Sequence, residues 1–288
     1  MNSFTFPTAL SRTITLLAAA AQRRTMPRGL RALACGGLAA LAMLAGCSAY
    51  RPGGLDIDRS KQAVSQNSRV EFIVLHYTSA SNETSLKILT ERNVSSHYLI
   101  TNHPTPRVYQ LVDESRRAWH AGVSAWYNSS NLNSASIGIE IVNPGPEGDT
   151  WAPYPTQQIQ VLATLIKDIM ARHEIKPFNV VGHSDIAPQR KLDPGPLFPW
   201  KALAQQGIGR WYDENFAQRF LTEFAAQGLP DMVWVQKELR RVGYAAPETG
   251  MLDKATRNVL AAFQMHYRPQ LYDGNPDAET LAILKALR

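Results

Sequence analysis

Two histidines and an aspartate stand where apolar runs of the sequence give way to polar ones. His183 follows the apolar run 178–181 and opens the loop His183-Ser-Asp-Ile-Ala-Pro-Gln-Arg-Lys-Leu-Asp193-Pro-Gly, whereas His76 closes the apolar run 70–75. Loops that leave the ends of strands often display functional side chains. Two imidazoles and one carboxylate form a three-ligand set for Zn²⁺ that leaves a fourth position for water, as in hydrolytic sites. The sequence therefore indicates a catalytic metal site made by His76, His183 and Asp193.

Histidines and aspartates in this sequence also have ordinary structural interpretations. A lone histidine is more often a core or surface residue than a ligand, and Asp193 precedes a proline, where aspartate commonly forms turns. His173 lies near the end of a predicted helix, where a cation suits the helix dipole. His266 belongs to the C-terminal region, which we expect to lie away from the site. Spacing alone leaves these interpretations open beside the metal site.

The elements that must position these residues are predicted by the hydrophobic pattern. Short apolar runs bounded by turn-prone sequence predict strands; they occur at 72–75, 97–100, 108–111, 137–142 and 178–181. A longer segment, 156–174, has an apolar face at helical spacing and predicts an amphipathic helix. Its face consists of Ile159, Leu162, Leu165, Ile166 and Ile169. Strands mixed with packed helices predict an α/β domain, which we place at residues 68–210.

The last part of the chain has a purely helical pattern. Three segments carry apolar residues on one helical face; they span 232–244, 253–267 and 276–287. They predict a small three-helix domain at 231–288, joined to the α/β domain by a linker at 211–230. Asp253 and Asp277 stand where they would cap helices.

The N-terminal region has the pattern of a bacterial lipoprotein signal. Arg28 and Arg31 precede the apolar, small-residue stretch 32–46, which ends immediately before Cys47. The segment Leu44-Ala-Gly-Cys47 resembles a lipobox, so we expect a signal peptide at 1–46, a lipid on Cys47, and a polar tether at 47–67. The stretch is too short to span a membrane well, so lipid would provide the anchoring.

Charge and cysteine usage narrow the classes of partner and of site. The net charge is +6, but residues 1–46 contain five arginines and no acidic residue, so the remainder carries only +1. This distribution argues against a nucleic-acid partner. The only cysteines are Cys35, inside the leader, and Cys47. The mature chain then has no disulfide, and any metal site in it must use His, Asp or Glu.

Several motifs, taken in order, resemble one enzyme family over residues 68–210. They are Val74-Leu-His76-Tyr-Thr78, Val94-Ser-Ser-His97-Tyr98, Trp119-His120-Ala-Gly-Val-Ser-Ala-Trp126, Ser136-Ile-Gly-Ile-Glu140 and the His183–Asp193 loop. The family is that of the zinc-dependent N-acetylmuramoyl-L-alanine amidases of type 2, related to phage T7 lysozyme and animal peptidoglycan recognition proteins. The resemblance implies a central mixed β-sheet flanked by helices.

The C-terminal region resembles a second family. The segment Val235-Gln-Lys-Glu-Leu-Arg-Arg-Val-Gly-Tyr244, followed by Thr249-Gly-Met-Leu-Asp253, Phe263-Gln264 and Asp273-Gly274, is similar to the small helical peptidoglycan-binding domain of bacterial wall enzymes. Within the amidase family, outer-membrane lipoproteins of the amidase D type combine both domains, so the resemblance covers nearly the whole mature chain.

The amidase resemblance implies a role for each matching residue. His76, His183 and Asp193 would hold Zn²⁺. Glu140 would act as general acid and base, and Lys191 would stabilise the oxyanion. The substrate-binding positions, some of which could instead orient ligands, would be His97, Trp119, His120, Ala121 and Arg190. The bond cut would be the amide between the lactyl group of muramic acid and L-alanine, and the sequence leaves open whether anhydromuramic substrates are accepted too.

Two other functions compete with the amidase. One is a catalytically silent peptidoglycan-binding lipoprotein, although all the catalytic positions are present here. The other is a zinc peptidase that cuts within the stem peptide, but such enzymes typically show a His-x-His pair, which this chain lacks.

Ser48 stands after Cys47 where aspartate would signal retention in the inner membrane, so the resemblance implies an outer-membrane lipoprotein that faces the periplasm. Nothing in the sequence demands more than a monomer.

Overall fold

The computed structural model describes residues 57–288. The predicted signal peptide and Cys47 lie outside the described residues. The chain divides into two units, 1–64 and 65–288, and the second contains every helix and strand of the described part. Within residues 57–288 we find no helix that is both long and apolar enough to cross a membrane.

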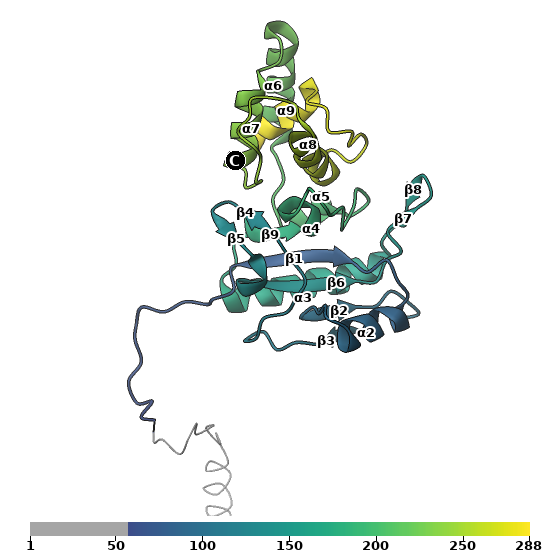
Figure 1. Ribbon diagram of the computed structural model, residues 1–288, viewed down its shortest axis with the longest axis vertical. Coiled ribbons are helices and arrows are strands. Elements are labelled where there is room, and N and C mark those ends of the chain that lie inside the picture. Colours follow the sequence, from purple (N-terminus) through teal and green to yellow (C-terminus); the bar gives the residue numbers. More distant parts are fainter. Residues whose placement is uncertain (1–56) are drawn as a thin grey trace, which may run out of the picture. The chain divides into compact units, whose positions relative to one another are not determined.

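A five-stranded mixed sheet forms the centre of the fold (Figure 1). Three of its parallel strands are β6 (Ser136–Ile141), β1 (Phe72–Tyr77) and β9 (Val180–Gly182), in that spatial order, with β9 at one edge. Next to β6 lies β2 (Tyr98–Ile100), also parallel, and β3 (Val108–Gln110) closes that side as an antiparallel edge. This sheet, with helices on both faces, confirms the predicted fold class, and each of its strands overlaps a predicted one.

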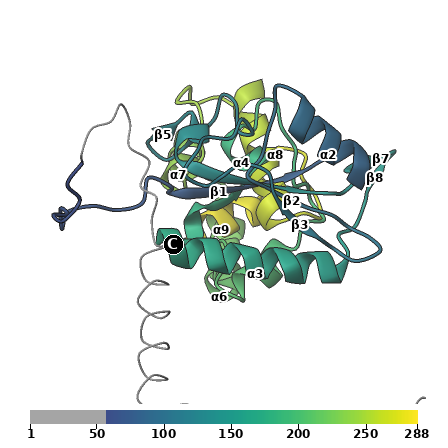
Figure 2. The same ribbon diagram turned by 90° about the horizontal axis from the view of Figure 1, so that it is seen from below.

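Alternation along β1 divides its side chains between the two faces of the sheet. Ile73 and Leu75 pack into the cluster that contains the long helix α3 (Thr156–His173), which runs along one face of the sheet (Figure 2). Phe72 and Val74 point into a different cluster on the opposite face. His76 continues the second set, so the pleat directs it away from α3.

Several short elements surround the sheet, and the sequence pattern did not predict them. They are α2 (Asn82–Glu91), β4 (Ala125–Trp126), β5 (Ser129–Ser130), the 3₁₀ turns at Leu132–Ser134 and Pro177–Asn179, β7 (Pro146–Glu147), β8 (Thr150–Trp151), α4 (His183–Ile186) and α5 (Trp200–Ala204). Most are too short to show a hydrophobic period. The amphipathic signal of α2 is weak because only Ser85 and Leu89 are buried along it.

Four helices, rather than three, make up the C-terminal region. They are α6 (Glu214–Gln227), α7 (Met232–Arg241), α8 (Lys254–Tyr267) and α9 (Ala278–Ala286). The segment predicted to be a linker, 211–230, is therefore largely the helix α6, which packs against α9. Its signal was readable, since Phe216, Phe220 and Phe224 recur at helical spacing and contact the core cluster of this region.

Aspartates start all four of these helices. The carboxylates of Asp213, Asp231, Asp253 and Asp277 each accept a hydrogen bond from a backbone N–H in the first turn of the helix that follows. Each bond satisfies a donor that the helix itself cannot pair. The predicted capping roles of Asp253 and Asp277 are thus confirmed.

The helical region shares a core with the second face of the sheet. Phe72 and Val74 of β1 belong to the same buried cluster as Val235, Leu239 and Phe263 of the helices. We call residues 214–288 the helical module. It packs directly on the α/β domain instead of hanging from a flexible connection.

Leu162 offers a direct test of the packing of α3 on the sheet. Its side chain is fully buried between α3 and the strands, so truncation to alanine leaves a cavity. We expect Leu162→Ala to lower the free energy of unfolding by about 2–5 kcal/mol, measured by urea denaturation. Thr164→Ala, on the exposed side of the same helix, should change it by less than about 0.5 kcal/mol. Equal losses in both variants would contradict this account of the core.

Candidate metal centre and active site

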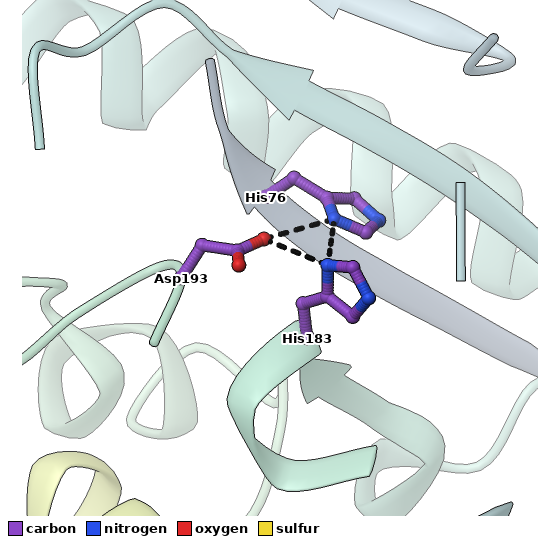
Figure 3. Close-up of side chains that lie close together, drawn as sticks. All are labelled: His76, His183 and Asp193. Carbon is purple, nitrogen blue, oxygen red and sulfur yellow. Dashed lines mark hydrogen bonds and ion pairs between the residues drawn. The ribbon is translucent and has the colours of Figure 1, made fainter. Parts of the chain in front are cut away.

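The three predicted ligand residues converge on one point (Figure 3). Nδ1 of His76 lies 2.9 Å from Nδ1 of His183, and each of these atoms lies 3.0 Å from Oδ2 of Asp193. His76 is the next-to-last residue of β1, His183 begins α4, and Asp193 ends the loop after α4. All three side chains are buried.

Backbone pairing explains why His76 meets His183 and Asp193, which follow it by 107 and 117 positions in the sequence. Leu75 pairs with Gly182 across the parallel strands β1 and β9, so His76 and His183 follow at the same edge of the sheet. The backbone N–H of Ser184 then donates to the carbonyl of Asp193 at 2.7 Å, which closes the loop. The loop thereby brings the carboxylate of Asp193 back beside His183, the residue at which the loop begins.

The contacts around both imidazoles fix which nitrogen faces the centre. Nε2 of His183 lies 3.2 Å from the carbonyl oxygen of Ala121. A carbonyl can only accept, so Nε2 carries the proton and Nδ1 presents a lone pair. This is the outer hydrogen bond that typically orients a metal-binding histidine.

A longer chain of hydrogen bonds sets His76 in the same state. The hydroxyl of Ser136 donates to the carbonyl of Leu132 at 2.6 Å, so its oxygen accepts from Nε2 of His120 at 3.2 Å. Nδ1 of His120 is then an acceptor, 3.1 Å from Nε2 of His76. His76 therefore donates through Nε2 and also presents a bare Nδ1 to the centre.

The donor set fits a divalent cation such as zinc. Two lone pairs and a carboxylate oxygen within 3.0 Å of one another repel unless a cation lies among them. Around a tetrahedral ion with bonds of about 2.0–2.2 Å, ligand atoms are about 3.3–3.6 Å apart, so only a small expansion is required. With nitrogen and oxygen donors alone, the site is less selective for zinc than one with thiolate.

The pKa values of His76 and Asp193 suit this role. Burial, helped by the neighbouring His183, lowers the pKa of His76 to about 4, which keeps its imidazole neutral. Burial alone would raise the pKa of Asp193, but its close contacts with the rings of His183 and His76 hold it well below its usual range. Both residues are thus in the deprotonated state that metal binding requires.

Glu140 faces the same pocket from the neighbouring strand. It lies directly opposite His76 in the register of β1 and β6, and residues paired in this way point to the same face of a sheet. Burial first, and then the charge of Asp193, raise the pKa of Glu140 well above the usual value, while Lys191 opposes the shift. Its Oε2 is buried without a hydrogen-bond partner among the described residues, so it is free to accept a proton.

A pocket of about 490 Å³ opens over the centre. Its walls include most of the predicted site residues, namely His76, Trp119, His120, Glu140, His183, Arg190, Lys191 and Asp193. Leu89, Val94 and Leu192 add apolar surface. Side chains with polar and apolar groups thus surround one open metal position.

Three of the predicted substrate-binding residues make mainly backbone contacts. His97 is buried outside the pocket wall, where Nδ1 accepts from Gly138 N–H and Nε2 donates to the carbonyl of Arg116. Ala121 contributes its carbonyl to His183 and is itself buried. Arg190 lines the pocket, yet its guanidinium donates to the carbonyls of Ala121 and Val123.

Trp119 and His120 are adjacent in sequence but have different surroundings. The Trp119 side chain is 54% exposed and stacks with the guanidinium of Arg117. His120 instead fills the space above Gly138, where a Cβ atom would lie 2.4 Å from its ring. Of the two, Trp119 is available to a substrate, and His120 orients His76.

Some residues important to the site were not predicted. Ser136 and Leu132 orient His120, and Tyr77 lines the pocket with a pKa raised to about 12 by burial and by Asp193. Ser136 begins the Ser-Ile-Gly-Ile-Glu140 motif, but only the folded backbone shows which carbonyl its hydroxyl reaches. His266, which we expected to lie away from the site, contacts the turn that carries His183.

Comparisons with known proteins agree with this geometry. Residues 66–196 match the family described as N-acetylmuramoyl-L-alanine amidase, and residues 229–284 match a peptidoglycan binding domain. The chain is 46% identical to the N-acetylmuramoyl-L-alanine amidase AmiD of Escherichia coli K12, over 87% of this chain and 95% of that protein. The chain therefore belongs to the N-acetylmuramoyl-L-alanine amidase family.

Two solved structures are similar over most of the chain. One is the complex of E. coli AmiD with anhydro-N-acetylmuramic acid-L-Ala-D-γ-Glu-L-Lys, with a TM-score of 0.74 and 45% identity over 82% of this chain and 95% of that one. The other is AmpDh3 of Pseudomonas aeruginosa with an anhydromuramic pentapeptide, with a TM-score of 0.76 and 44% identity over 81% and 96%. Both similarities include the helical module, because each covers far more than the 131 residues of the amidase match.

The hydrogen bond between His120 and His76 can be tested through metal affinity. Replacing His120 by alanine leaves Nε2 of His76 without its acceptor and lets the ring turn. We expect His120→Ala to weaken zinc binding about 10- to 100-fold, measured by competition with a chromophoric chelator. Trp119→Ala, which removes the exposed neighbour, should leave the affinity unchanged. An unaltered zinc affinity in His120→Ala would show that His120 does not orient His76.

Proposed function

We propose that this amidase uses Zn²⁺ to hydrolyse the amide between the lactyl group of N-acetylmuramic acid, including its anhydro form, and L-alanine, and so releases stem peptides. The observation that carries the proposal is the convergence of His76, His183 and Asp193 beside Glu140 in one open pocket. The anhydromuramic peptides bound to AmiD and AmpDh3 support the substrate class.

His76, His183 and Asp193 would hold the zinc ion. Bound zinc would lower the pKa of a water molecule and polarise the scissile carbonyl. The protein supplies the two Nδ1 lone pairs and one carboxylate oxygen, all three from buried side chains. His120 and the Ala121 carbonyl hold the two rings in orientation.

Glu140 would move the protons of the reaction. It takes one from the attacking water and gives it to the amine nitrogen of L-alanine as the carbon–nitrogen bond breaks. Its raised pKa, caused first by burial, brings the carboxylate closer to the pH at which it must both accept and donate. The unpartnered Oε2 gives the water proton an acceptor.

Lys191 would stabilise the negative oxygen that forms on the scissile carbonyl. It lines the same pocket, and its charge acts on both Glu140 and His76. The backbone N–H of Lys191 is bound to the carbonyl of Ala187 within the short turn before Asp193, so its main chain is held near the ligands. Loss of such a donor typically costs about 3–4 kcal/mol of transition-state stabilisation.

The substrate would bind along the wall that carries Trp119. An exposed indole supported by a stacked guanidinium offers a flat apolar surface for a sugar ring. For His120, Ala121 and Arg190 we propose an indirect contribution, through the loop and the rings that they hold in place. His97, at the base of the same group, would support His120, with ring centroids 5.8 Å apart.

We also propose that the enzyme is a monomer anchored in the outer membrane and faces the periplasm. The lipobox at Leu44–Cys47, with Ser48 after it, supports lipid attachment to Cys47 and sorting to that membrane. Peptidoglycan lies in the same compartment. The amidase domain would extend over residues 68–210, and the helical module would start with α6 and not at residue 231.

A catalytically silent peptidoglycan-binding protein is the alternative. The complete ligand set, the acidic residue opposite His76 and the lysine in the pocket count against it. A protein that only bound peptidoglycan would have no need for a buried, unpartnered carboxylate oxygen, which is costly to maintain.

Glu140→Gln separates catalysis from metal binding. The amide keeps the shape of the side chain but cannot carry the proton, so kcat should fall by about 10²- to 10⁴-fold, while zinc content stays near one per chain. Mass spectrometry of muropeptide digests provides the measurement, with free stem peptide and intact sugar as the expected products of the unaltered enzyme.

The matched control is Glu91→Gln, at the exposed end of α2, which should retain full activity. Shortened peptides still joined to muramic acid would refute the amidase assignment. Full activity in Glu140→Gln would refute only the role of Glu140.

Cys47→Ala tests the anchor. Without the thiol no lipid can be attached, so the protein should move from the membrane fraction to the soluble periplasmic fraction, as detected by immunoblotting. Ser48→Ala keeps the thiol and should leave the protein in the membrane fraction. Sedimentation of Cys47→Ala with the membranes would count against lipid anchoring.

A further inference from the structure

The turn that carries His183 is bonded to the helical module through a single buried carboxylate. Asp185 lies two residues after His183 in the four-residue helix α4 and is 1% exposed. Its Oδ2 accepts from the backbone N–H of Gly182 at 2.7 Å, which fixes the start of this turn. The remaining hydrogen bonds to the carboxylate come from the other side of the domain boundary.

Two side chains of the helical module complete the set of donors around Asp185. The hydroxyl of Tyr244 donates to Oδ1 at 2.6 Å, and Nδ1 of His266 lies 2.9 Å from Oδ2. Both rings are buried, at 1% and 4% exposure. The other ring nitrogen of His266 has no partner among the described residues, so the contact with Asp185 is the only directional bond of this ring.

Packing around His266 holds it in place. Its ring stacks with Trp200 of α5 at 3.9 Å between centroids and with Tyr267 at 4.1 Å. Figure 1 shows α8, which carries His266, next to α4 and α5. A histidine clamped in this way directs its N–H at a carboxylate that cannot move without breaking three hydrogen bonds.

A second contact joins the middle of the same loop to α8. The side chain of Gln189 donates to the carbonyl of Ala255 at 2.9 Å and accepts from the amide of Asn258 at 2.9 Å. The loop from His183 to Asp193 is therefore attached to the helical module at two points. The two ends of the loop are also bonded to each other, because Ser184 N–H donates to the Asp193 carbonyl.

We propose that the helical module positions His183 and Asp193 for catalysis through the contacts of Tyr244 and His266 with Asp185. In this account, which rests on the proposed zinc amidase function, the module contributes to turnover of small soluble substrates that need no attachment to the wall. Tyr244, His266 and Asp185 are positioning residues, since none of them lines the pocket.

The test compares substitutions at His266 in the otherwise complete chain. His266→Ala removes the donor to Asp185. His266→Asn places an amide NH₂ near the position of Nδ1 and should restore the bond. Gln264→Ala is the matched control, because Gln264 is buried in the same helix but bonds only within the module, to Gly274, Asn275 and Thr280.

Each variant is characterised by kcat and KM on a soluble anhydromuramoyl tripeptide, by the zinc dissociation constant from chelator competition, by hydrogen–deuterium exchange of residues 182–193 and by Tm. We expect His266→Ala to lower kcat about tenfold with KM nearly unchanged, to weaken zinc binding about tenfold and to speed exchange of the loop. His266→Asn should recover most of each effect. Gln264→Ala should lower Tm by about as much as His266→Ala does, but it should leave the exchange of residues 182–193 unchanged.

The proposal is overturned if His266→Ala and Gln264→Ala change kcat, zinc affinity and loop exchange equally, or if neither changes them. A failure of the amidase function itself is recognised separately, as an unaltered chain that neither binds zinc nor releases stem peptide. In that event the loop exchange still decides the positioning role, because it requires neither metal nor turnover.

Discussion

The site depends on the position of β1 between two parallel neighbours. Pairing with β6 sets His76 opposite Glu140, and pairing with β9 brings His183 to the same edge of the sheet. Parallel strands all end at the same edge, so side chains from separate parts of the chain meet there. A shift of one residue in either pairing would turn His76 or Glu140 to the α3 face. The fully buried Ile73, Leu75, Ile137 and Ile139 oppose such a shift, because it would turn them out of their core cluster.

The candidate metal ligands His76 and His183 are distinct from the groups that orient their rings, which are His120 and the Ala121 carbonyl. The lone pairs of His76 and His183 face the centre because their outer nitrogens donate, one to His120 and one to the Ala121 carbonyl. These outer contacts add no charge to the site. Burial and the neighbouring histidines lower the pKa of His120 well below its normal value, so its ring stays neutral. A charged ring at this position would repel any cation placed among His76, His183 and Asp193. The neutral chain from His76 to Leu132 therefore orients a ligand without weakening its attraction for metal.

Much of this arrangement follows from the sequence, and the remainder does not for definite physical reasons. The long apolar face of α3 and the runs that became β1 and β6 have clear periods, so their positions were predicted to within two residues at each end. The positions of His76 and His183 after such runs are enough to suggest ligands. The link between Asp185 and His266 has no local signal, since 81 residues separate the two. Ser136 was also hidden, because its role depends on a backbone carbonyl that becomes available only after folding.

The interface between the two domains changes how the helical module should be regarded. A module that only tethers an enzyme to its polymer needs few contacts with the catalytic domain, and a small polar interface would be sufficient. Here the module shares a hydrophobic cluster with one face of the sheet, and Trp126 packs so closely on Gly243 that a Cβ there would lie 2.7 Å from its ring. The buried carboxylate of Asp185 adds a stronger constraint. Withdrawal of the module would remove two of the three hydrogen bonds to this carboxylate, together with the rings of Tyr244 and His266 that pack on it. Separation of the domains is therefore unfavourable for the turn that carries His183, and the catalytic unit of this protein includes α7 and α8 as well as the sheet.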